Sequence, residues 1–262
     1  MQDLAKLTPS IVQIAKQAGE FIAREAADFD QSKVEFKGKS DLVSYVDKGA
    51  EKIIVEGLKA LLPEAGFLTE EKTVEQTQTE LTWIIDPLDG TTNFVHGLPG
   101  YAVSIGLSQG KEVILGVIYE ITRDEAFYAW KGGGAYMNGA KIAVSQAAKI
   151  DDSLLATGFP IYNFAKITEY LTILNELMRN SHGLRRLGSA AMDLAYVACG
   201  RCEAFFEYNL NSWDVAAGII LVQEAGGTVT DFSGGTDALH GRELVAGGPV
   251  HAELLHLIKE NW

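Results

Sequence analysis

Residues 83–94, WIIDPLDGTTNF, join a short apolar run to a segment that carries two carboxylates. The Trp-Ile-Ile run favours a buried β-strand. Pro87 restricts its own φ and has no N–H to donate, so we expect Asp86 and Asp89 to be held about one turn apart. The Leu88 carbonyl lies between them in the sequence. Carboxylate, carbonyl and carboxylate together are hard oxygen ligands of the kind that divalent cations prefer.

Gly90, Thr91 and Thr92 follow directly and offer backbone N–H groups and two hydroxyls where a helix or tight turn could begin. This combination suits a phosphate that bridges metal ions. The alternative is an Asp-rich turn whose side chains bond only their own backbone, which is a common use of Asp and Thr. The motif by itself leaves both interpretations open.

The composition indicates one folded, acidic protein of 262 residues, with 47% hydrophobic and 22% charged residues. A formal charge of -13 opposes nonspecific binding to nucleic acid or to an anionic membrane. The sequence shows no apolar run near the ~20 residues of a membrane span and no signal-peptide pattern at MQDLAKLTPS. We therefore predict a cytoplasmic protein that has neither a nucleic-acid polymer nor a membrane as its partner.

The hydrophobic pattern predicts stacked layers of helix and sheet. Residues 67–136 are rich in strand patterns, and no Pro-, Gly- or Ser-rich linker divides the chain. We therefore expect a single unit over residues 1–262, with a possible subdivision into 1–150 and 151–262. Helices are expected at residues 11–26, 46–62, 164–178, 190–198 and 214–225 and at the C-terminus.

Two other motifs favour structural roles. KGGGAYMNG at residues 131–139 lacks the GxxxxGK[ST] pattern of a phosphate loop and favours a hairpin. CGRC at residues 199–202 could suggest redox chemistry or half of a zinc site. No second cysteine pair exists, and no histidine stands at ligand spacing, so a structural role is favoured.

Three further acidic positions could meet the carboxylates of the quoted stretch. Glu70 and its neighbour Glu71 end the apolar run GFLTE, Asp47 opens the second expected helix, and Asp214 starts another. An acid in the first turn of a helix is also favourable by itself. Acids at the ends of four separate elements predict a shared cleft more strongly than any single acid does.

The stretches WIIDPLDGTTNF, NSWDVAAGIILVQEAGG and GFLTEE together resemble the inositol monophosphatase family of metal-dependent phosphatases. The resemblance extends over nearly the whole chain, from SDLVSYVD to EAGGTVTDF. It implies an α+β fold, a layered α-β-α-β-α sandwich of the inositol monophosphatase and fructose-1,6-bisphosphatase type. It also suggests a homodimer and inhibition by lithium.

The resemblance implies a role for each matching residue. Two or three Mg²⁺ ions would bind at Glu70, Asp86, the Leu88 carbonyl, Asp89 and Asp214. The catalytic residues would be Asp47, Glu70 and Thr91, with Asp47 and Thr91 orienting and activating the attacking water. The substrate-binding residues would be Gly90, Thr91 and Thr92 on the phosphate side and Gly188, Ser189, Ala190, Glu207 and Asp214 on the polyol side.

The chemistry explains why metal is needed. Two unit charges 4 Å apart repel by about 4 kcal/mol at an effective dielectric near 20, so an empty acidic cleft should reject phosphate. Cations reverse that polarity and allow direct attack by an activated water. We expect Glu207 to be an exposed strand residue that accepts hydrogen bonds from substrate hydroxyls. Arg185 and Arg186 could hold an anion or could be surface charges, and we leave them out of the predicted site.

Several alternatives stay open from the sequence. DPLDGT resembles the DxDGT loop of haloacid dehalogenase-type phosphatases, but here the two aspartates are three positions apart instead of two. A noncatalytic protein that binds metal and a phosphorylated ligand is a second alternative. Within the family, inositol monophosphate is our first substrate. Fructose 1,6-bisphosphate, 3′-phosphoadenosine 5′-phosphate and NADP are the others.

Overall fold

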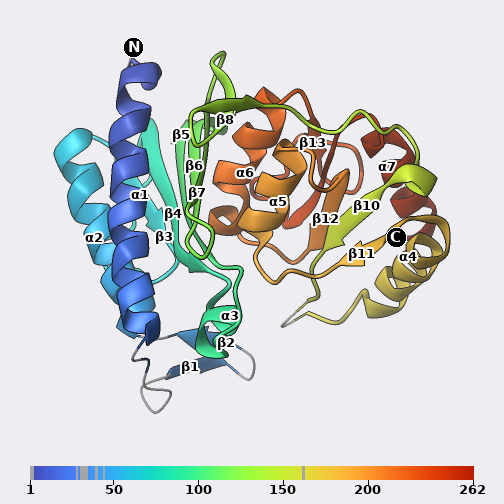
Figure 1. The fold of residues 1–262 in the computed structure, drawn as a ribbon, viewed down its shortest axis with the longest axis horizontal. Coiled ribbons are helices and arrows are strands. Elements are labelled where there is room, and N and C mark those ends of the chain that lie inside the picture. Colours follow the sequence, from blue (N-terminus) through green and yellow to red (C-terminus); the bar gives the residue numbers. More distant parts are fainter. Residues whose placement is uncertain (1–2, 28, 30–34, 39–40, 44, 161–162) are drawn as a thin grey trace.

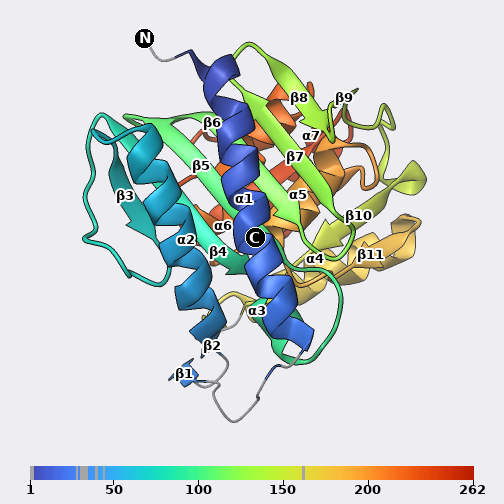
Figure 2. The same cartoon turned by 60° about the vertical axis from the view of Figure 1, so that its left-hand side comes forward.

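The structure, a computed structural model, describes residues 3–27, 29, 35–38, 41–43, 45–160 and 163–262. Helices and sheets alternate in five layers across these residues (Figure 1). Helices α1 (Leu4–Ala27) and α2 (Tyr45–Leu61) form the first layer. They lie side by side across the outer face of the first sheet (Figure 2). This arrangement confirms the predicted α+β sandwich with layers α-β-α-β-α.

The first sheet has seven strands in the described part of the chain, and they follow one another in sequence order. Only β3 and β4 are parallel, and the other neighbours pair antiparallel. Parallel pairing brings the ends of β3 and β4 to the same edge, where the Glu70 N–H donates to the Ile85 carbonyl at 3.2 Å. The strands are β3 (Gly66–Thr69), β4 (Leu81–Asp89), β5 (Ala102–Gln109), β6 (Glu112–Glu120), β7 (Glu125–Trp130), β8 (Gly134–Met137) and β9 (Ala140–Ile142).

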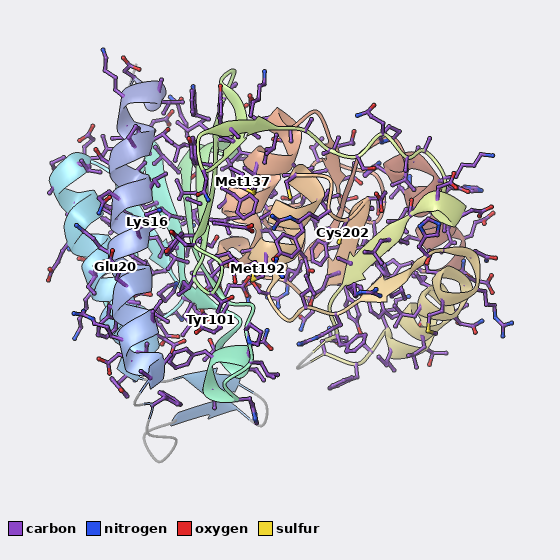
Figure 3. All side chains as sticks on the ribbon, in the orientation of Figure 1. Lys16, Glu20, Tyr101, Met137, Met192 and Cys202 are labelled. Atoms are coloured by element: carbon purple, nitrogen blue, oxygen red, sulfur yellow. The ribbon has the colours of Figure 1, made fainter. Side chains whose placement is uncertain are left out.

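The middle layer consists of α5 (Ala190–Ala198) and α6 (Ser212–Glu224), which are apolar on nearly all sides because sheets cover both faces. Met192 of α5 and Cys202, which lies between α5 and the next strand, belong to the apolar core around this layer (Figure 3). Small residues let α6 approach the first sheet closely. A Cβ added to Gly116 would lie 2.5 Å from the Ala217 carbonyl oxygen. This approach sets the distance between the start of α6 and the end of β4.

The second sheet has the strand order β11-β10-β12-β14-β13 within the described ranges, with β10 parallel to both of its neighbours. Helices α4 (Ile167–Asn180) and α7 (His251–Asn261) cover its outer face. Side chains of β12 alternate, so Phe206 faces α4 and α7 while Phe205 faces the middle layer. The strands are β10 (Leu154–Thr157), β11 (Gly183–Arg185), β12 (Ala204–Tyr208), β13 (Thr228–Thr230) and β14 (Glu243–Gly247).

The short elements are β1 (Glu35–Gly38), β2 (Asp41–Val43), α3 (Thr91–Val95) and the 3-10 helix η2 (Ile150–Asp152). None of the described helices, including the 24-residue α1, combines the length and apolarity that crossing a membrane requires. The two sheets derive from residues on either side of residue 150, yet the middle helices come from the second part and pack against both sheets. The subdivision at residue 150 stays a prediction.

Most predicted elements are confirmed, with boundaries shifted by a few residues. The first helix starts at Leu4 instead of residue 11, because Leu4 and Leu7 extend the apolar stripe and offset the cost of Pro9 inside the helix. The glycine-rich segment is the predicted hairpin, since Trp130 pairs antiparallel with Gly134. The structure also shows that part of this segment forms strand β8.

The close packing of α5 on α6 predicts that Gly218→Ala destabilises the protein. The new Cβ would lie 2.5 Å from the Cβ of the fully buried Leu194. We expect a loss of about 1–3 kcal/mol in the free energy of unfolding, although Ala is the better helix former by roughly 1 kcal/mol. Urea unfolding monitored by circular dichroism measures it.

Gly49→Ala is the matched control, because it also replaces a helical glycine. Its Cβ would meet only the tip of the half-buried Phe21 ring, at 2.7 Å, and that ring can turn aside. We expect the control to keep or slightly raise the free energy of unfolding. A Gly218→Ala protein as stable as the control would contradict the packing described for α5 and α6.

Candidate functional site

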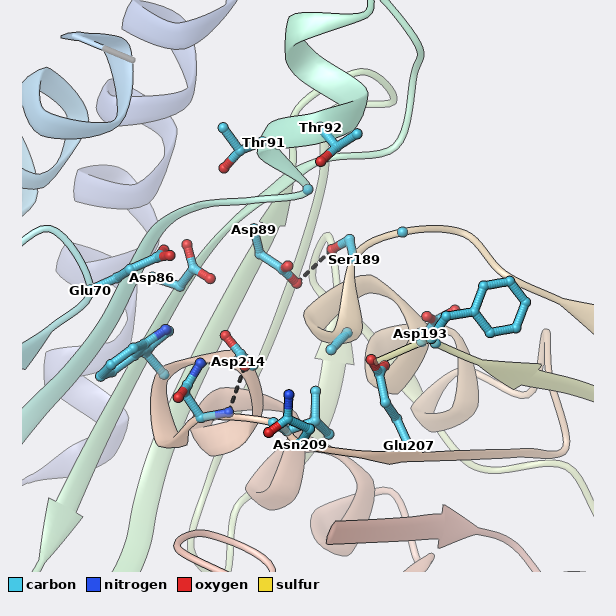
Figure 4. Close-up of a pocket in the computed structure, with 18 of the residues that line it drawn as sticks. Glu70, Asp86, Asp89, Thr91, Thr92, Ser189, Asp193, Glu207, Asn209 and Asp214 are labelled. Atoms are coloured by element: carbon cyan, nitrogen blue, oxygen red, sulfur yellow. Dashed lines mark hydrogen bonds between the residues drawn. The ribbon is translucent and has the colours of Figure 1, made fainter. Parts of the chain in front are cut away.

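A cavity of about 380 Å³ lies where β3, β4 and β12 end and where α5 and α6 begin (Figure 4). Its volume suits a small ligand instead of a polymer. Six acidic residues line it: Glu70, Asp86, Asp89, Asp193, Glu207 and Asp214. Of the other predicted site residues, Leu88, Gly90, Thr91, Thr92, Gly188, Ser189 and Ala190 also line it. Asp47 lies directly behind Thr91 and is buried.

The DPLD segment differs from the expected turn, because β4 continues through it to Asp89. Asp86 pairs with Ser104 and Asp89 with Ala102, so three steps along β4 match two steps along β5. In a regular strand, side chains three positions apart point to opposite faces. The bulge adds one residue and brings both carboxylates to the same side. Its extra backbone is held by a hydrogen bond from the Leu88 N–H to Asp86 Oδ1 at 3.0 Å.

Gly90 ends the strand and begins α3 with a φ of 96°. This left-handed conformation favours glycine, and an added Cβ would also lie 3.0 Å from the Gly100 carbonyl oxygen. The next hydroxyl, Thr91 Oγ1, lies 3.0 Å from Asp47 Oδ1 and 2.9 Å from the Leu88 carbonyl oxygen. One hydroxyl proton thus serves two acceptors, which fixes the Thr91 side chain at the cavity wall.

Asp89 joins the first sheet to the middle layer. Its Oδ2 accepts hydrogen bonds from Ser189 Oγ at 2.7 Å and from the Ala191 N–H at 2.6 Å. Ser189 also caps α5, since its Oγ accepts from the Met192 N–H at 3.2 Å. The sequence suggested Ser189 only as a substrate contact. The structure shows that its hydroxyl holds a carboxylate that is 100 positions away.

Burial raises the pKa of the carboxyls of Asp86, Asp89 and Asp214, which lie close to one another. For Asp86 the charges of Glu70, Asp89 and Asp214 act in the same direction as burial, so its pKa lies well above the usual range. Burial raises the pKa of Asp89 to about 6, despite the hydrogen bonds from Ser189 and the Ala191 N–H. Burial and then the Asp89 charge raise the pKa of Asp214 to about 7. Positive charge in the cavity would relieve this repulsion.

The donor set fits a divalent cation. Carboxylate oxygens and the Leu88 carbonyl are the hard oxygens that Mg²⁺ prefers, and the charges of Glu70, Asp86, Asp89 and Asp214 act on one another. Among the described residues, no group of three or more His, Cys, Asp or Glu side chains is arranged to hold an ion as it stands.

A second wall of the cavity carries Glu207 and Asp193. Glu207 is half-buried, which corrects the expectation of an exposed strand residue, because it faces the middle layer beside Asp193 (Figure 4). Burial raises the pKa of both carboxyls well above the usual range. Asp193 was missed from the sequence, although it stands one helical turn after Ser189 and so on the same face of α5.

Arg186 was also left out of the predicted site, and the structure places it on the cavity wall. Its positive charge acts to lower the pKa of Asp89, Asp193 and Glu207, and its guanidinium lies 5.9 Å from the centre of the Phe159 ring. The sequence could not separate Arg186 from the adjacent Arg185, because only the path of the chain after β11 directs one of them to the cavity.

The cysteine pair lies outside this chemistry. Cys199 and Cys202 are free thiols, and neither lines the cavity. Burial raises the pKa of both thiols, to about 12 for Cys202. A high pKa disfavours the thiolate that redox chemistry and zinc binding require. The structural role favoured by the sequence agrees with these surroundings.

The raised pKa of Asp214 predicts that stability without divalent cations falls with rising pH. Between 3.8, its ordinary value, and about 7 the folded chain binds more protons at this carboxyl than the unfolded chain does. The free energy of unfolding should therefore decrease across this interval. Thermal melts between about pH 4.5 and pH 7.5 in a chelator test it. Asp214→Asn, which stays neutral, should show a flatter dependence, and the exposed Asp151→Asn should match the wild type.

Comparison with known proteins agrees with the family resemblance seen in the sequence. The sequence model of the inositol monophosphatase family matches residues 3–262. An inositol-1-monophosphatase of Mesorhizobium japonicum is 42% identical over 95% of each chain. The Nus factor SuhB of Escherichia coli strain K12 is 43% identical over 91% of this chain and 90% of its own.

A solved structure shows the same fold. The crystal structure of extragenic suppressor protein suhB from Bartonella henselae matches with a TM-score of 0.92 and 40% identity, covering 98% of this chain and 100% of that one. The haloacid dehalogenase-type alternative is thereby excluded. The chain belongs to the inositol monophosphatase family and is an enzyme that hydrolyses phosphoric monoesters.

Proposed function

We propose that this enzyme uses Mg²⁺ to hydrolyse a small polyol or sugar phosphate monoester, with inositol monophosphate as the first candidate. The observation that carries the proposal is the gathering of Glu70, Asp86, Asp89 and Asp214 in one cavity where burial and mutual repulsion raise carboxyl pKa values. The similarity to inositol-1-monophosphatases supports the choice of substrate.

Two or three Mg²⁺ ions would be held by Glu70, Asp86, the Leu88 carbonyl, Asp89 and Asp214. Bound Mg²⁺ would supply positive charge that lowers the pKa of an attacking water and stabilises the leaving oxygen. The raised pKa values support this donor set, because carboxyls that repel one another in the absence of a cation gain most from binding one.

Thr91 and Asp47 would move the proton of the attacking water. Thr91 Oγ1 donates its own proton toward Asp47 Oδ1 and the Leu88 carbonyl, so its lone pairs are left to accept a hydrogen bond from water at the cavity wall. As Thr91 takes the proton of that water, its own proton would pass to the Asp47 carboxylate. Glu70, which lies beside Asp86 (Figure 4), would accept a second hydrogen bond from that water. Two acceptors would then orient one nucleophile.

Two parts of the cavity wall would bind the substrate. Gly90, Thr91 and Thr92 start α3 at the cavity and would contact the phosphate. On the other wall, Glu207 would accept hydrogen bonds from substrate hydroxyls. Gly188, Ser189, Ala190 and Asp214 would complete this wall. A cavity of about 380 Å³ favours a small monophosphate over NADP.

Two further predictions belong to the same proposal. The resemblance to the family suggests a homodimer, and the acidic composition suits a cytoplasmic enzyme with small phosphorylated substrates. Fructose 1,6-bisphosphate and 3′-phosphoadenosine 5′-phosphate are the alternative substrates. The hydrogen-bonded pair of Thr91 and Asp47 supports a catalytic role over the noncatalytic alternative.

Asp89→Asn tests the metal site. The change removes one negative charge from the proposed ligands, and we expect kcat with Mg²⁺ to fall by at least about 100-fold while the far-ultraviolet circular dichroism stays unchanged. Phosphate release measures kcat. Asp151→Asn, an exposed acid on η2, is the control and should keep full activity. Near-normal turnover by Asp89→Asn would count against the metal assignment.

A substrate panel tests the specificity. With Mg²⁺ present, kcat/KM should be highest for inositol 1-phosphate, compared with fructose 1,6-bisphosphate, 3′-phosphoadenosine 5′-phosphate and NADP, because a small cavity with acidic residues on its second wall suits a small polyol with a single phosphate. The assay again follows phosphate release. A higher kcat/KM on any of the other compounds would replace inositol monophosphate with that substrate while leaving the phosphatase chemistry in place.

A further inference from the structure

The carboxylate of Glu207 lies directly against the backbone of Gly158. A Cβ added to Gly158 would lie 2.0 Å from Glu207 Cδ and 2.0 Å from its Oε2, closer than any two such atoms can approach. Gly158 is the first residue after β10, and β10 pairs with β12, the strand that carries Glu207. The position of the carboxylate therefore depends on how the ends of these two strands are aligned.

Two buried hydroxyls fix that alignment. Thr157 Oγ1 and Tyr170 Oη lie 2.5 Å apart, and we call this pair the hydroxyl clamp. Thr157 Oγ1 is also 2.9 Å from the Phe206 carbonyl oxygen on β12, and Tyr170 Oη is 3.0 Å from the Gly158 carbonyl oxygen. The clamp thus contacts the backbone at Phe206, the residue before Glu207, and at Gly158, against which the Glu207 carboxylate lies.

The two hydroxyl protons determine which strands the clamp connects. The clamp has two hydroxyl protons, and one of them must lie between oxygens that are only 2.5 Å apart. The other proton then goes from Thr157 or Tyr170 to the Phe206 or Gly158 carbonyl oxygen, because each hydroxyl also lies 3.3 Å from the second of these carbonyls. When the acceptor is the Phe206 carbonyl, a continuous chain of hydrogen bonds joins α4, β10 and β12.

Tyr170 reaches this point from the far side of the second sheet. Its fully buried ring packs on Phe206, Tyr208 and Trp262, with ring centres 5.5, 4.9 and 6.3 Å away. Such packing fixes the direction of the hydroxyl. Burial, and then the charge of Glu207, raise the pKa of Tyr170, so the phenol keeps the proton that the clamp needs.

We propose that Thr157 and Tyr170 are positioning residues that fix the Glu207 carboxylate for recognition of a substrate hydroxyl, in the space that Gly158 leaves open. Neither residue lines the cavity, so both would act only through Glu207. The inference rests on the proposed function of Glu207 as the acceptor for polyol hydroxyls. It assigns substrate specificity in part to α4, a helix on the outer face of the molecule.

The test compares a polyol substrate with one that has no hydroxyls to recognise. The variants are Tyr170→Phe, Thr157→Val, Thr157→Ser, Gly158→Ala and Glu207→Gln, each assayed with Mg²⁺ on inositol 1-phosphate and on p-nitrophenyl phosphate. Tyr136→Phe is the control, because its hydroxyl also bonds a backbone carbonyl, that of Gly133, but lies outside the cavity. Thermal melts of every variant separate stability from specificity.

We expect Glu207→Gln and Gly158→Ala to lower kcat/KM for inositol 1-phosphate at least about tenfold and to change the value for p-nitrophenyl phosphate less than about twofold. Tyr170→Phe and Thr157→Val should lower the inositol 1-phosphate value about three- to tenfold, mainly through KM, with the same small effect on the aryl substrate. Thr157→Ser keeps the hydroxyl and should behave like the wild type and the control.

The outcomes distinguish the inference from the function on which it rests. If Glu207→Gln changes the preference but Tyr170→Phe and Thr157→Val do not, the clamp is only structural and the inference is wrong. Equal losses on both substrates in the clamp variants would overturn it as well. If Glu207→Gln itself leaves the preference unchanged, the proposed role of Glu207 fails, and the inference fails with it.

Discussion

Repulsion among buried carboxylates at the meeting point of two sheets is the constraint on which this site depends. Burial raises the pKa of Asp86, Asp89 and Asp214, and their charges act on one another. The fold tolerates this arrangement because backbone N–H groups and Ser189 bond the same carboxyls. Such a site stores unfavourable electrostatic energy that a cation can release, which links the stability of the fold to the chemistry proposed for it.

Packing between the layers determines how closely these charges lie. Glycines in β5 and β6 allow α6 to approach the first sheet, so that Asp214 at the start of the helix reaches the cavity where β4 ends. The bulge between Asp86 and Asp89 turns both side chains the same way. The close approach of α6 positions Asp214, and the bulge in β4 orients Asp86 and Asp89. Neither feature alone would bring all of these oxygen donors together.

The two sheets contribute different parts of the cavity. The first sheet and α3 supply the acids and hydroxyls proposed to act on water and phosphate, whereas the second sheet supplies Glu207 and the clamp behind it. Arg186 lies near the second wall and balances part of its negative charge. This division allows Glu207 and the clamp to vary without disturbing the acids that the first sheet supplies.

The sequence by itself determined the layered fold class, because helix and strand periodicity acts locally. It also determined the acidic residues of the quoted stretch and their distant partners Glu70 and Asp214, because the motifs that contain them are specific. Only the tertiary structure decided the bulge, the bond from Ser189 to Asp89, the places of Arg186 and Asp193, and the hydroxyl clamp. These features depend on strand register and on contacts between residues that are distant in the chain, and local pattern carries no information about either.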